Sequence, residues 1–160
     1  MTFMRITLTA LACTLAISLT ACSSVDLKKD NQYSDANVND MINNPNGPLA
    51  KKSVYFDFDS YSVDQQNMPV VQNHGQFLSE HKNVQVRLEG NTDERGGREY
   101  NLALGQRRSE AVKSRMTLMG VSPDQIETVS FGKEKPKAYG HDEESWAENR
   151  RVDIQYQVNQ

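Results

Sequence analysis

Four segments of the chain alternate between hydrophobic and polar residues, which is the pattern of a β-strand with one buried face. The clearest is "VQVRLEG" at 84–90, where Val84, Val86 and Leu88 fall on one side. The other three are "SVYFDF" at 53–58, "TVSFG" at 128–132 and "RVDIQYQV" at 151–158. We therefore predict four strands.

Two longer segments have the spacing of amphipathic helices. The first covers 62–81, with Ser62 placed to cap its N-terminus. Its inner side is marked by Met68, Val71, Gln72 and Leu78. The second runs from Glu99 to Met119 and ends before Gly120, the residue type that commonly follows a helix. Short helical turns are predicted at 122–126 and 145–150.

The order of these elements is strand, helix, strand, helix, short helical turn, strand, strand, or βαβα(short α)ββ. Four strands in one sheet, with two long helices on one face, make an α+β domain built as an α/β sandwich. We predict that this domain covers residues 51–160 and contains no internal repeat.

The N-terminus has a different pattern, an apolar run from Ile6 to Leu19 behind one cation, Arg5. About fourteen residues are too few to span a bilayer comfortably and are typical of a signal-peptide core. "LTAC", with small residues directly before Cys22, follows this run. We predict a lipoprotein signal peptide at 1–21, whose removal leaves Cys22 carrying a diacylglyceryl group and acyl chains such as palmitate. The alternative is an ordinary secretory signal that happens to contain a cysteine.

The segment after the signal peptide has the composition of a tether. Removal of the signal peptide would take Cys13 away and leave Cys22 as the only cysteine, so we expect no intramolecular disulfide. Residues 22–50 are rich in Asn, Asp, Ser and Lys, and they show no sustained hydrophobic period. That composition predicts a disordered tether. Ser23, directly after the lipidated cysteine, favours the outer membrane over the inner one.

One charge on the second long helix lies where an apolar side chain is expected. On a helical wheel of about 100° per residue with Leu104 at zero, Arg108 falls at about 40°. The apolar stripe around it consists of Leu104, Ala111, Val112, Leu118 and Met119. A guanidinium buried in such a stripe is costly unless it is paired, so we expect Arg108 to meet a fixed anion or to hold an anionic ligand. Arg107 falls on the rim. Arg115 lies on the same side two turns later and can reach solvent, so the wheel alone leaves a structural role for Arg108 open.

Charge and composition narrow the classes of function. A net charge of −3 and the lack of a basic block argue against a nucleic-acid partner. The carboxylates that could serve a cell-wall hydrolase are Asp57, Asp59, Asp93 and Glu94. They support an enzyme only weakly, because carboxylates are plentiful in an acidic chain. There is no G-x-S-x-G motif, and the histidines, which are His74, His81 and His141, lack the spacing of metal ligands. We expect a protein without catalytic activity, metal or cofactor.

Three stretches carry a family resemblance, "VYFDFDS", "EGNTDERGGREYNLALGQRR" and "FGKEKPKAYGHDEESWAENRR". They contain the TD-x-x-G, YN-x-x-L-G-x-R-R and NRR signatures in order. Residues 53–157 thereby resemble the peptidoglycan-associated lipoproteins of the OmpA-like C-terminal domain family, and the cysteine motif and tether also fit. The resemblance implies the OmpA-like α/β sandwich, in agreement with the predicted order of elements.

The resemblance also implies a function. Members of the family bind the peptide stem of peptidoglycan without a covalent bond, mainly through meso-diaminopimelate. They belong to the Tol–Pal system, whose periplasmic β-propeller protein is the implied partner. By motif position, Arg108 would bind the carboxylate of the diaminopimelate centre and Asp93 would accept from its ammonium. The other pocket residues would be Phe58, Asp59, Arg95 and Leu104, and Asn101, Asn149 and Arg150 would organise the loops.

Several of these side chains also have a plain structural interpretation. Phe58 and Leu104 could belong to the core alone. Asp59 could cap a turn, and Arg95 could be a solvated loop charge. A second alternative for the whole protein is an interaction lipoprotein whose pocket is vestigial.

Two positions depart from the family pattern. Asp57 stands where relatives often carry a small residue, which adds an acid beside the pocket. Asn91 stands where much of the wider superfamily has histidine. Neither departure touches the proposed pair of Asp93 and Arg108, although Asp57 could change the local affinity.

Overall fold

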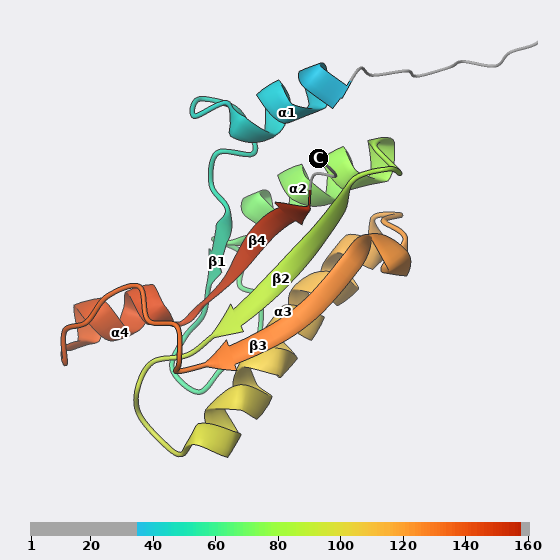
Figure 1. The fold of residues 1–160 in the computed structure, drawn as a ribbon. Helices are drawn as coiled ribbons and strands as arrows, with labels where there is room; N and C mark the ends of the chain where they lie inside the picture. The colour runs from blue at the N-terminus through green and yellow to red at the C-terminus, as the bar shows by residue number, and fades with distance from the viewer. Residues whose placement is uncertain (1–34, 158–160) are drawn as a thin grey trace, which may run out of the picture. The chain divides into compact units, whose positions relative to one another are not determined.

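The computed structural model describes residues 35–157 (Figure 1). The predicted signal peptide, Cys13, Cys22, Ser23 and the first part of the predicted tether lie outside the described residues. No helix within 35–157 combines the length and the apolar character that crossing a bilayer requires.

Within these residues four strands form one sheet in the order β1-β4-β2-β3. The strands are β1 (Ser53–Tyr55), β2 (Gln85–Asn91), β3 (Ile126–Gly132) and β4 (Arg151–Gln157). β4 runs antiparallel to both β1 and β2, whereas β2 and β3 are parallel. The period-2 alternation points Val86, Leu88, Val152 and Ile154 inward, and all four are fully buried.

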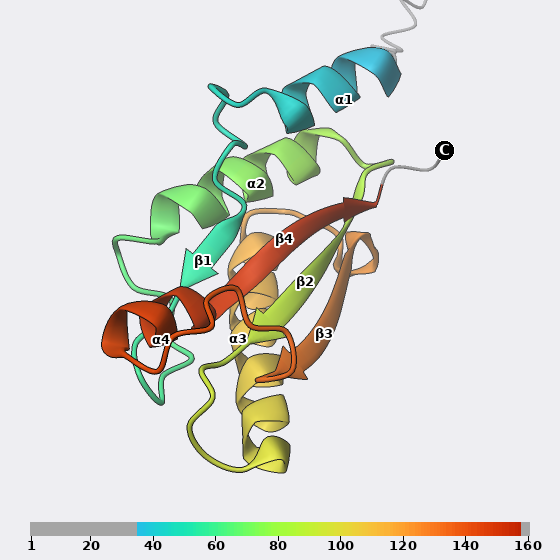
Figure 2. The ribbon, with the colours of Figure 1, turned by 60° about the vertical axis from the view of Figure 1, so that its left-hand side comes forward.

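Two long helices, α2 (Met68–Glu80) and α3 (Arg98–Leu118), cover one face of the sheet (Figures 1 and 2). α3 connects the parallel strands β2 and β3. A 3₁₀ turn, η1 (Pro123–Gln125), leads into β3, and the helix α4 (Glu143–Asn149) precedes β4. The core lies between helices and sheet, where Val71, Leu78, Val112 and Met116 pack against the inward strand residues. The predicted α+β fold and its four-stranded sheet are confirmed.

Two predicted boundaries move for identifiable reasons. The strand predicted at 53–58 ends at Tyr55, because residues 57–60 form a turn in which Ser60 N donates to Asp57 O at 3.2 Å. The helix predicted from residue 62 begins at Met68, so Ser62 is not its cap. Pro69 lacks an N–H, so it fits the first turn of a helix, where that donor is not needed, and not the middle.

The start of the folded domain differs from the predicted boundary at residue 51. Helix α1 (Asp35–Asn43) lies inside the predicted tether, and Val38, Ile42 and Leu49 are buried in the core. The segment is further held by Asn73 Nδ2, which donates to the Pro48 carbonyl at 3.1 Å. The sequence did not predict this helix because its few apolar residues lie among Asn and Asp and show no sustained helical period. Val38 and Ile42 are nevertheless four residues apart, which places them on one face of a helix.

The buried side of α3 also lies elsewhere than predicted. Leu104 and Val112 are buried, but Leu118 is 79% exposed. The buried residues of the helix are Asn101, Leu104, Gly105, Arg108, Ser109, Val112 and Met116. Their stripe is centred near Val112 because the small residues Gly105 and Ser109 face the sheet, where the helix approaches β2 closely. Arg108 still falls within it.

Candidate ligand-binding site

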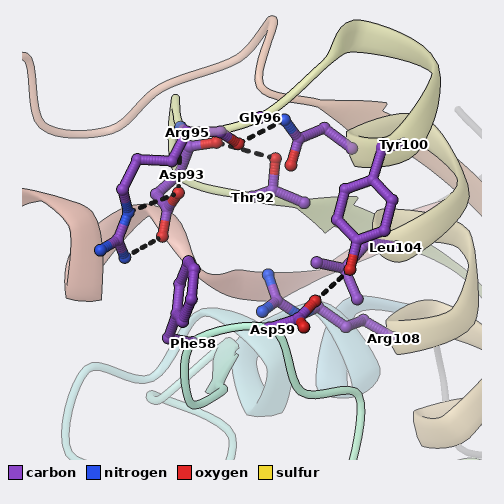
Figure 3. A pocket seen from close by; sticks show the side chains of 10 residues that line it. Phe58, Asp59, Thr92, Asp93, Arg95, Gly96, Tyr100, Leu104 and Arg108 are labelled. Carbon is purple, nitrogen blue, oxygen red and sulfur yellow. Dashed lines mark hydrogen bonds and ion pairs between the residues drawn. The ribbon is translucent and has the colours of Figure 1, made fainter.

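Three segments meet beside the carboxyl end of β2 and enclose a cavity of about 200 Å³ (Figure 3). They are the loop from β1 to α2, the loop from β2 to α3, and the first turns of α3. All six residues predicted to form a pocket line this cavity, namely Phe58, Asp59, Asp93, Arg95, Leu104 and Arg108. Thr92, Gly96, Tyr100 and Asn101 complete the lining. Residues from distant parts of the sequence therefore form one concave site.

Arg108 lies at the base of the cavity and is completely buried. Its guanidinium donates to three backbone carbonyls, through Nε to Ser60 at 2.8 Å, through Nη1 to Asn91 at 2.9 Å and through Nη2 to Asp57 at 3.0 Å. The ring of Phe56 lies 5.2 Å from the guanidinium carbon. The expected fixed anion is absent, because none of residues 35–157 forms an ion pair with Arg108.

This arrangement leaves Arg108 charged, with only part of its hydrogen-bonding capacity used. Burial lowers the pKa of its guanidinium to about 10, so it stays protonated at neutral pH. A guanidinium has five N–H donors, and the three carbonyls use three of them. The carbonyls fix the plane of the fork without neutralising its charge. The remaining donors suit an anion with two oxygens, such as a carboxylate.

Asp93 forms the opposite pole and is held by arginines. Its Oδ1 accepts from the backbone N of Arg95 at 3.1 Å and from Arg95 Nε at 3.2 Å, and its Oδ2 accepts from Arg95 Nη2 at 2.7 Å. Arg150 Nη1 lies 3.4 Å from Oδ2. Burial alone raises the pKa of the Asp93 carboxyl, but the hydrogen bonds and charge of Arg95, with help from Arg150, outweigh burial and hold that pKa below its ordinary value. Asp93 is therefore a fixed carboxylate, and its pairing with Arg95 was not predicted.

Asp59 and Tyr100 lie next to each other on the side of the cavity opposite Asp93 and Arg95 (Figure 3). Tyr100 Oη donates to Asp59 Oδ1. The other Asp59 oxygen accepts no hydrogen bond from any residue in 35–157. Asp59 has a φ of +54°, a left-handed conformation that aspartate tolerates better than most residues. A strained backbone of this kind is common where a side chain must be held toward a ligand.

Sequence reasoning missed Tyr100, Thr92 and Gly96 as lining residues. For Tyr100 the signal was present, because Tyr100, Leu104 and Arg108 are spaced by four and must share one face of a helix. Thr92 and Gly96 flank the predicted Asp93 and Arg95 in the same loop. Gly96 has a φ of +86°, which favours glycine, and this allows the loop to turn around the cavity.

The residues expected to organise loops make contacts of that kind. Asn101 Nδ2 donates to the carbonyls of Arg95 and Gly97 at 2.8 and 3.1 Å, which ties the loop to the start of α3. Asn149 Oδ1 accepts from the backbone N of residues 137 and 138, at 2.7 and 3.0 Å. Arg150 donates through Nε to Phe56 O at 3.0 Å and through Nη2 to Glu143 Oε1 at 2.7 Å. Asn101 therefore braces a loop that lines the cavity, and Arg150 reaches the cavity through Asp93, whereas the contacts of Asn149 lie within the segment that joins β3 to β4.

The two departures from the family pattern lie beside the cavity and reach it through their backbones. The Asp57 and Asn91 carbonyls both accept from Arg108. The Asp57 side chain is exposed and lines a neighbouring groove with Asp64. Asn91 is buried, and its Nδ2 donates to Glu89 O at 2.9 Å. In 35–157 no group of histidine, cysteine and acidic residues is arranged to hold a metal ion.

Comparison with known proteins identifies the family of the chain. A model of the OmpA family matches residues 55–150, which is more than half of the chain. The chain therefore belongs to the OmpA family, and its similar relatives include proteins named peptidoglycan-associated lipoprotein.

Three similar proteins carry that name. The chain is 52% identical over 100 residues to the peptidoglycan-associated lipoprotein of Pseudomonas putida, covering 62% of this chain and 60% of that one. It is 46% identical over 104 residues to that of Pasteurella multocida, covering 65% and 69%. A crystal structure of the peptidoglycan-associated lipoprotein from Burkholderia pseudomallei superposes with a TM-score of 0.72 at 59% identity, covering 74% of this chain and all of that one. The match thus spans about 60% of the length of the Pseudomonas relative.

Proposed function

We propose that this protein is a non-enzymatic lipoprotein of the outer membrane that binds the peptide stem of peptidoglycan. The ligand group would be the free amino acid centre of meso-diaminopimelate, which carries one ammonium and one carboxylate. One observation carries this proposal. Arg108 is a fully buried cation at the base of a cavity, held by neutral carbonyls and without a carboxylate partner in the described part of the chain. Such a group favours an anionic ligand.

The carboxylate of the ligand would bind Arg108 through its remaining donors. For the ammonium, the structure supports a division of roles between Asp93 and Asp59. A carboxylate has about four acceptor sites, and Asp93 already accepts from Arg95 three times and from Arg150 once. Asp59 keeps one oxygen without a partner among residues 35–157. Asp59 would therefore accept from the ammonium directly, and Asp93 would contribute its fixed negative charge.

The proposed anchor is the lipidated Cys22 after removal of the signal peptide at 1–21. A diacylated cysteine holds a protein stably at a membrane, whereas one acyl chain gives only marginal binding. With the domain gripping the wall, the protein would connect outer membrane and peptidoglycan and support envelope integrity and cell division. Its proposed protein partner is the periplasmic β-propeller protein of the Tol system. Mass spectrometry of the protein from its native membrane should show an acylated Cys22, and an unmodified cysteine would contradict the anchor.

Co-sedimentation of the full chain with purified peptidoglycan tests the binding function. We expect the chain to sediment, and we expect a soluble stem tripeptide ending in meso-diaminopimelate to release it. Sedimentation that the tripeptide cannot compete would contradict stem recognition. Failure to sediment at all would favour the alternative of an interaction lipoprotein with a vestigial pocket. Release of soluble muropeptides from the sacculi would favour the hydrolase.

A further inference from the structure

A tryptophan outside the cavity is built into its wall. Trp146 lies on α4, in the segment that joins β3 to β4, and it is not among the residues that line the cavity. Its indole ring lies 4.1 Å from the Arg95 guanidinium carbon. The ring of Phe58 lies 4.1 Å from that same carbon. Arg95 is thus in contact with two aromatic rings, one from the β1–α2 loop and one from α4.

We infer that Trp146 is a positioning residue of the pocket, which acts through Arg95 on the carboxylate of Asp93. The inference rests on the proposed function, because it names a further residue on which stem-peptide affinity depends. Arg95 uses Nε and Nη2 to hold both Asp93 oxygens, and it can do so only while its plane keeps one orientation. The aromatic contacts set that plane.

The indole is itself locked by a second loop residue. Trp146 Nε1 donates to Glu94 Oε1 at 2.9 Å. His141 Nδ1 contacts the same carboxylate at 2.8 and 2.9 Å. Lys133 Nζ donates to the Glu94 and Gly96 carbonyls at 3.1 and 2.9 Å. The β3–β4 segment therefore grips the β2–α3 loop through both side-chain and backbone atoms, which fixes Trp146 against Arg95.

The effect of removing Trp146 can be judged from the contacts that Arg95 and Asp93 would still make. The Arg95 side chain is 31% exposed, and among residues 35–157, without the indole, only the Phe58 ring at 4.1 Å and Glu143 Oε2 at 3.7 Å would still contact it outside Asp93, so it can move toward solvent. Asp93 would then keep the backbone N of Arg95 at 3.1 Å and the longer contact to Arg150 at 3.4 Å. Its carboxylate would no longer be held at both oxygens by one guanidinium. Because the proposed role of Asp93 is to hold a negative charge in a fixed place near the ligand ammonium, a carboxylate that is no longer fixed should weaken binding, although Trp146 does not line the cavity.

Calorimetric titration of the full chain with the meso-diaminopimelate stem tripeptide tests the inference. Trp146→Leu, which keeps apolar volume but removes the aromatic face, should weaken binding about three- to tenfold. Trp146→Phe keeps an aromatic ring and should stay within about twofold of the wild-type chain. Tyr139→Ala is the matched control, because Tyr139 is an aromatic residue of the same segment that is 83% exposed. It should bind like the wild-type chain.

A double-mutant cycle with Arg95→Ala separates positioning from general stability. If Trp146 acts through Arg95, the double variant Trp146→Leu, Arg95→Ala should bind no more weakly than Arg95→Ala alone. Additive losses would overturn the inference, as would a folded Trp146→Leu chain that binds like the wild-type chain. If the Leu variant does not fold, a loss in the folded Phe variant as large as that of Arg95→Ala would also overturn it. A wild-type chain that does not bind the tripeptide would refute the proposed function itself, whereas the other failures would refute only the role of Trp146.

Discussion

Gly90 of β2 and Gly105 of α3 meet backbone to backbone, and a Cβ on Gly90 would overlap the carbonyl oxygen of Gly105. The Cβ that Gly105 lacks would lie 2.8 Å from the Gly90 carbonyl oxygen. This close approach brings α3 onto the end of β2, where Arg108 reaches the Asn91 carbonyl at 2.9 Å. The absence of two side chains therefore positions the cation of the site.

Gly90→Ala should destabilise the domain by at least about 2 kcal/mol, because an overpacked contact with backbone cannot relax by moving a side chain. Urea unfolding followed by circular dichroism measures the change. Gly97→Ala is the matched control, since a Cβ there meets nothing within 4 Å. Equal stability of the two variants would mean that α3 can move away from β2 at little cost.

Helix α1 should stabilise the domain although it lies in a segment with the composition of a tether. Ile42 is 3% exposed, so Ile42→Ala should lower the free energy of unfolding by about 2 to 4 kcal/mol. Met41→Ala, at a neighbouring position that is 36% exposed, should cost much less. Urea midpoints of both variants check this expectation. An Ile42→Ala midpoint equal to that of the wild-type chain would show that α1 adds nothing to the fold.

His74 should make the domain less stable in mild acid. It is completely buried, with Nδ1 2.6 Å from Tyr156 Oη and Nε2 2.9 Å from the Lys51 carbonyl. Because the carbonyl can only accept, Nε2 carries the proton and Nδ1 accepts from Tyr156. Burial lowers the pKa of His74 below 6.5, and the charge of Lys52 acts in the same direction.

The sign of the pH effect follows from this lowered pKa. The unfolded chain binds a proton at a higher pH than the folded one, so stability falls as the pH drops below 6.5 toward the folded pKa. Urea midpoints between pH 7.5 and 5 should show this decline, and His74→Gln should reduce its slope. His141→Gln should not reduce the slope and should make the decline steeper, because His141 has a raised pKa and stabilises the folded chain toward acid. An unchanged slope in His74→Gln would contradict the assignment.

His141 should titrate in the opposite direction. Its hydrogen bond to Glu94 raises the pKa of the imidazole above 6.5. The contribution of the pair is complete below 6.5 and is lost as the pH rises through the raised value. An NMR titration should show this shift and its return toward 6.5 in Glu94→Gln. Glu144→Gln, an exposed acid of the same segment, should leave the His141 titration unchanged. A pKa of His141 insensitive to Glu94 would contradict the contact.

Much of the fold could be predicted from local patterns, and particular residues show why the rest could not. Val86 and Leu88 alternate on β2, and a long periodic segment predicts α3, since each pattern depends on one element alone. Helix α1 was not predicted because the burial of Val38 and Ile42 depends on packing against the core of the folded domain, which is distant in sequence. The buried stripe of α3 differs from the predicted one because Gly105 faces the sheet. A helical wheel scores glycine as neither apolar nor polar, so it could not reveal this.

The site, too, was predictable only in part. Family motifs and the helical wheel pointed to Arg108, and the loop motif pointed to Asp93. Of the two partners expected for Arg108, a fixed anion or an anionic ligand, no fixed anion pairs with it among residues 35–157. The carbonyls of Asp57, Ser60 and Asn91 accept from it instead, and backbone acceptors cannot be recognised in a sequence. The pairing of Asp93 with Arg95 depends on the exact turn of the loop. Spacing alone could not distinguish it from two solvated charges.

The most direct test of the central claim is the dissociation constant, Kd, of the full chain for the meso-diaminopimelate stem tripeptide, measured by calorimetry with Arg108 variants. Arg108→Lys keeps the charge but loses the fork, and it should weaken binding substantially. Arg108→Ala should weaken it about thirty- to a thousandfold, or about 2 to 4 kcal/mol. Arg107→Ala, one residue away and exposed, is the matched control and should cost much less.

A modified ligand shows whether lost binding comes from lost recognition or from a change in folding. Amidating the free carboxylate of the diaminopimelate centre should weaken binding to the wild-type chain far more than binding to Arg108→Lys or Arg108→Ala, because those variants already lack the guanidinium that recognises this carboxylate. The account predicts that pattern together with a small effect of Arg107→Ala. Equal losses in the Arg107→Ala and Arg108→Ala chains, or a folded Arg108→Lys chain that binds and discriminates like the wild-type chain, would contradict it.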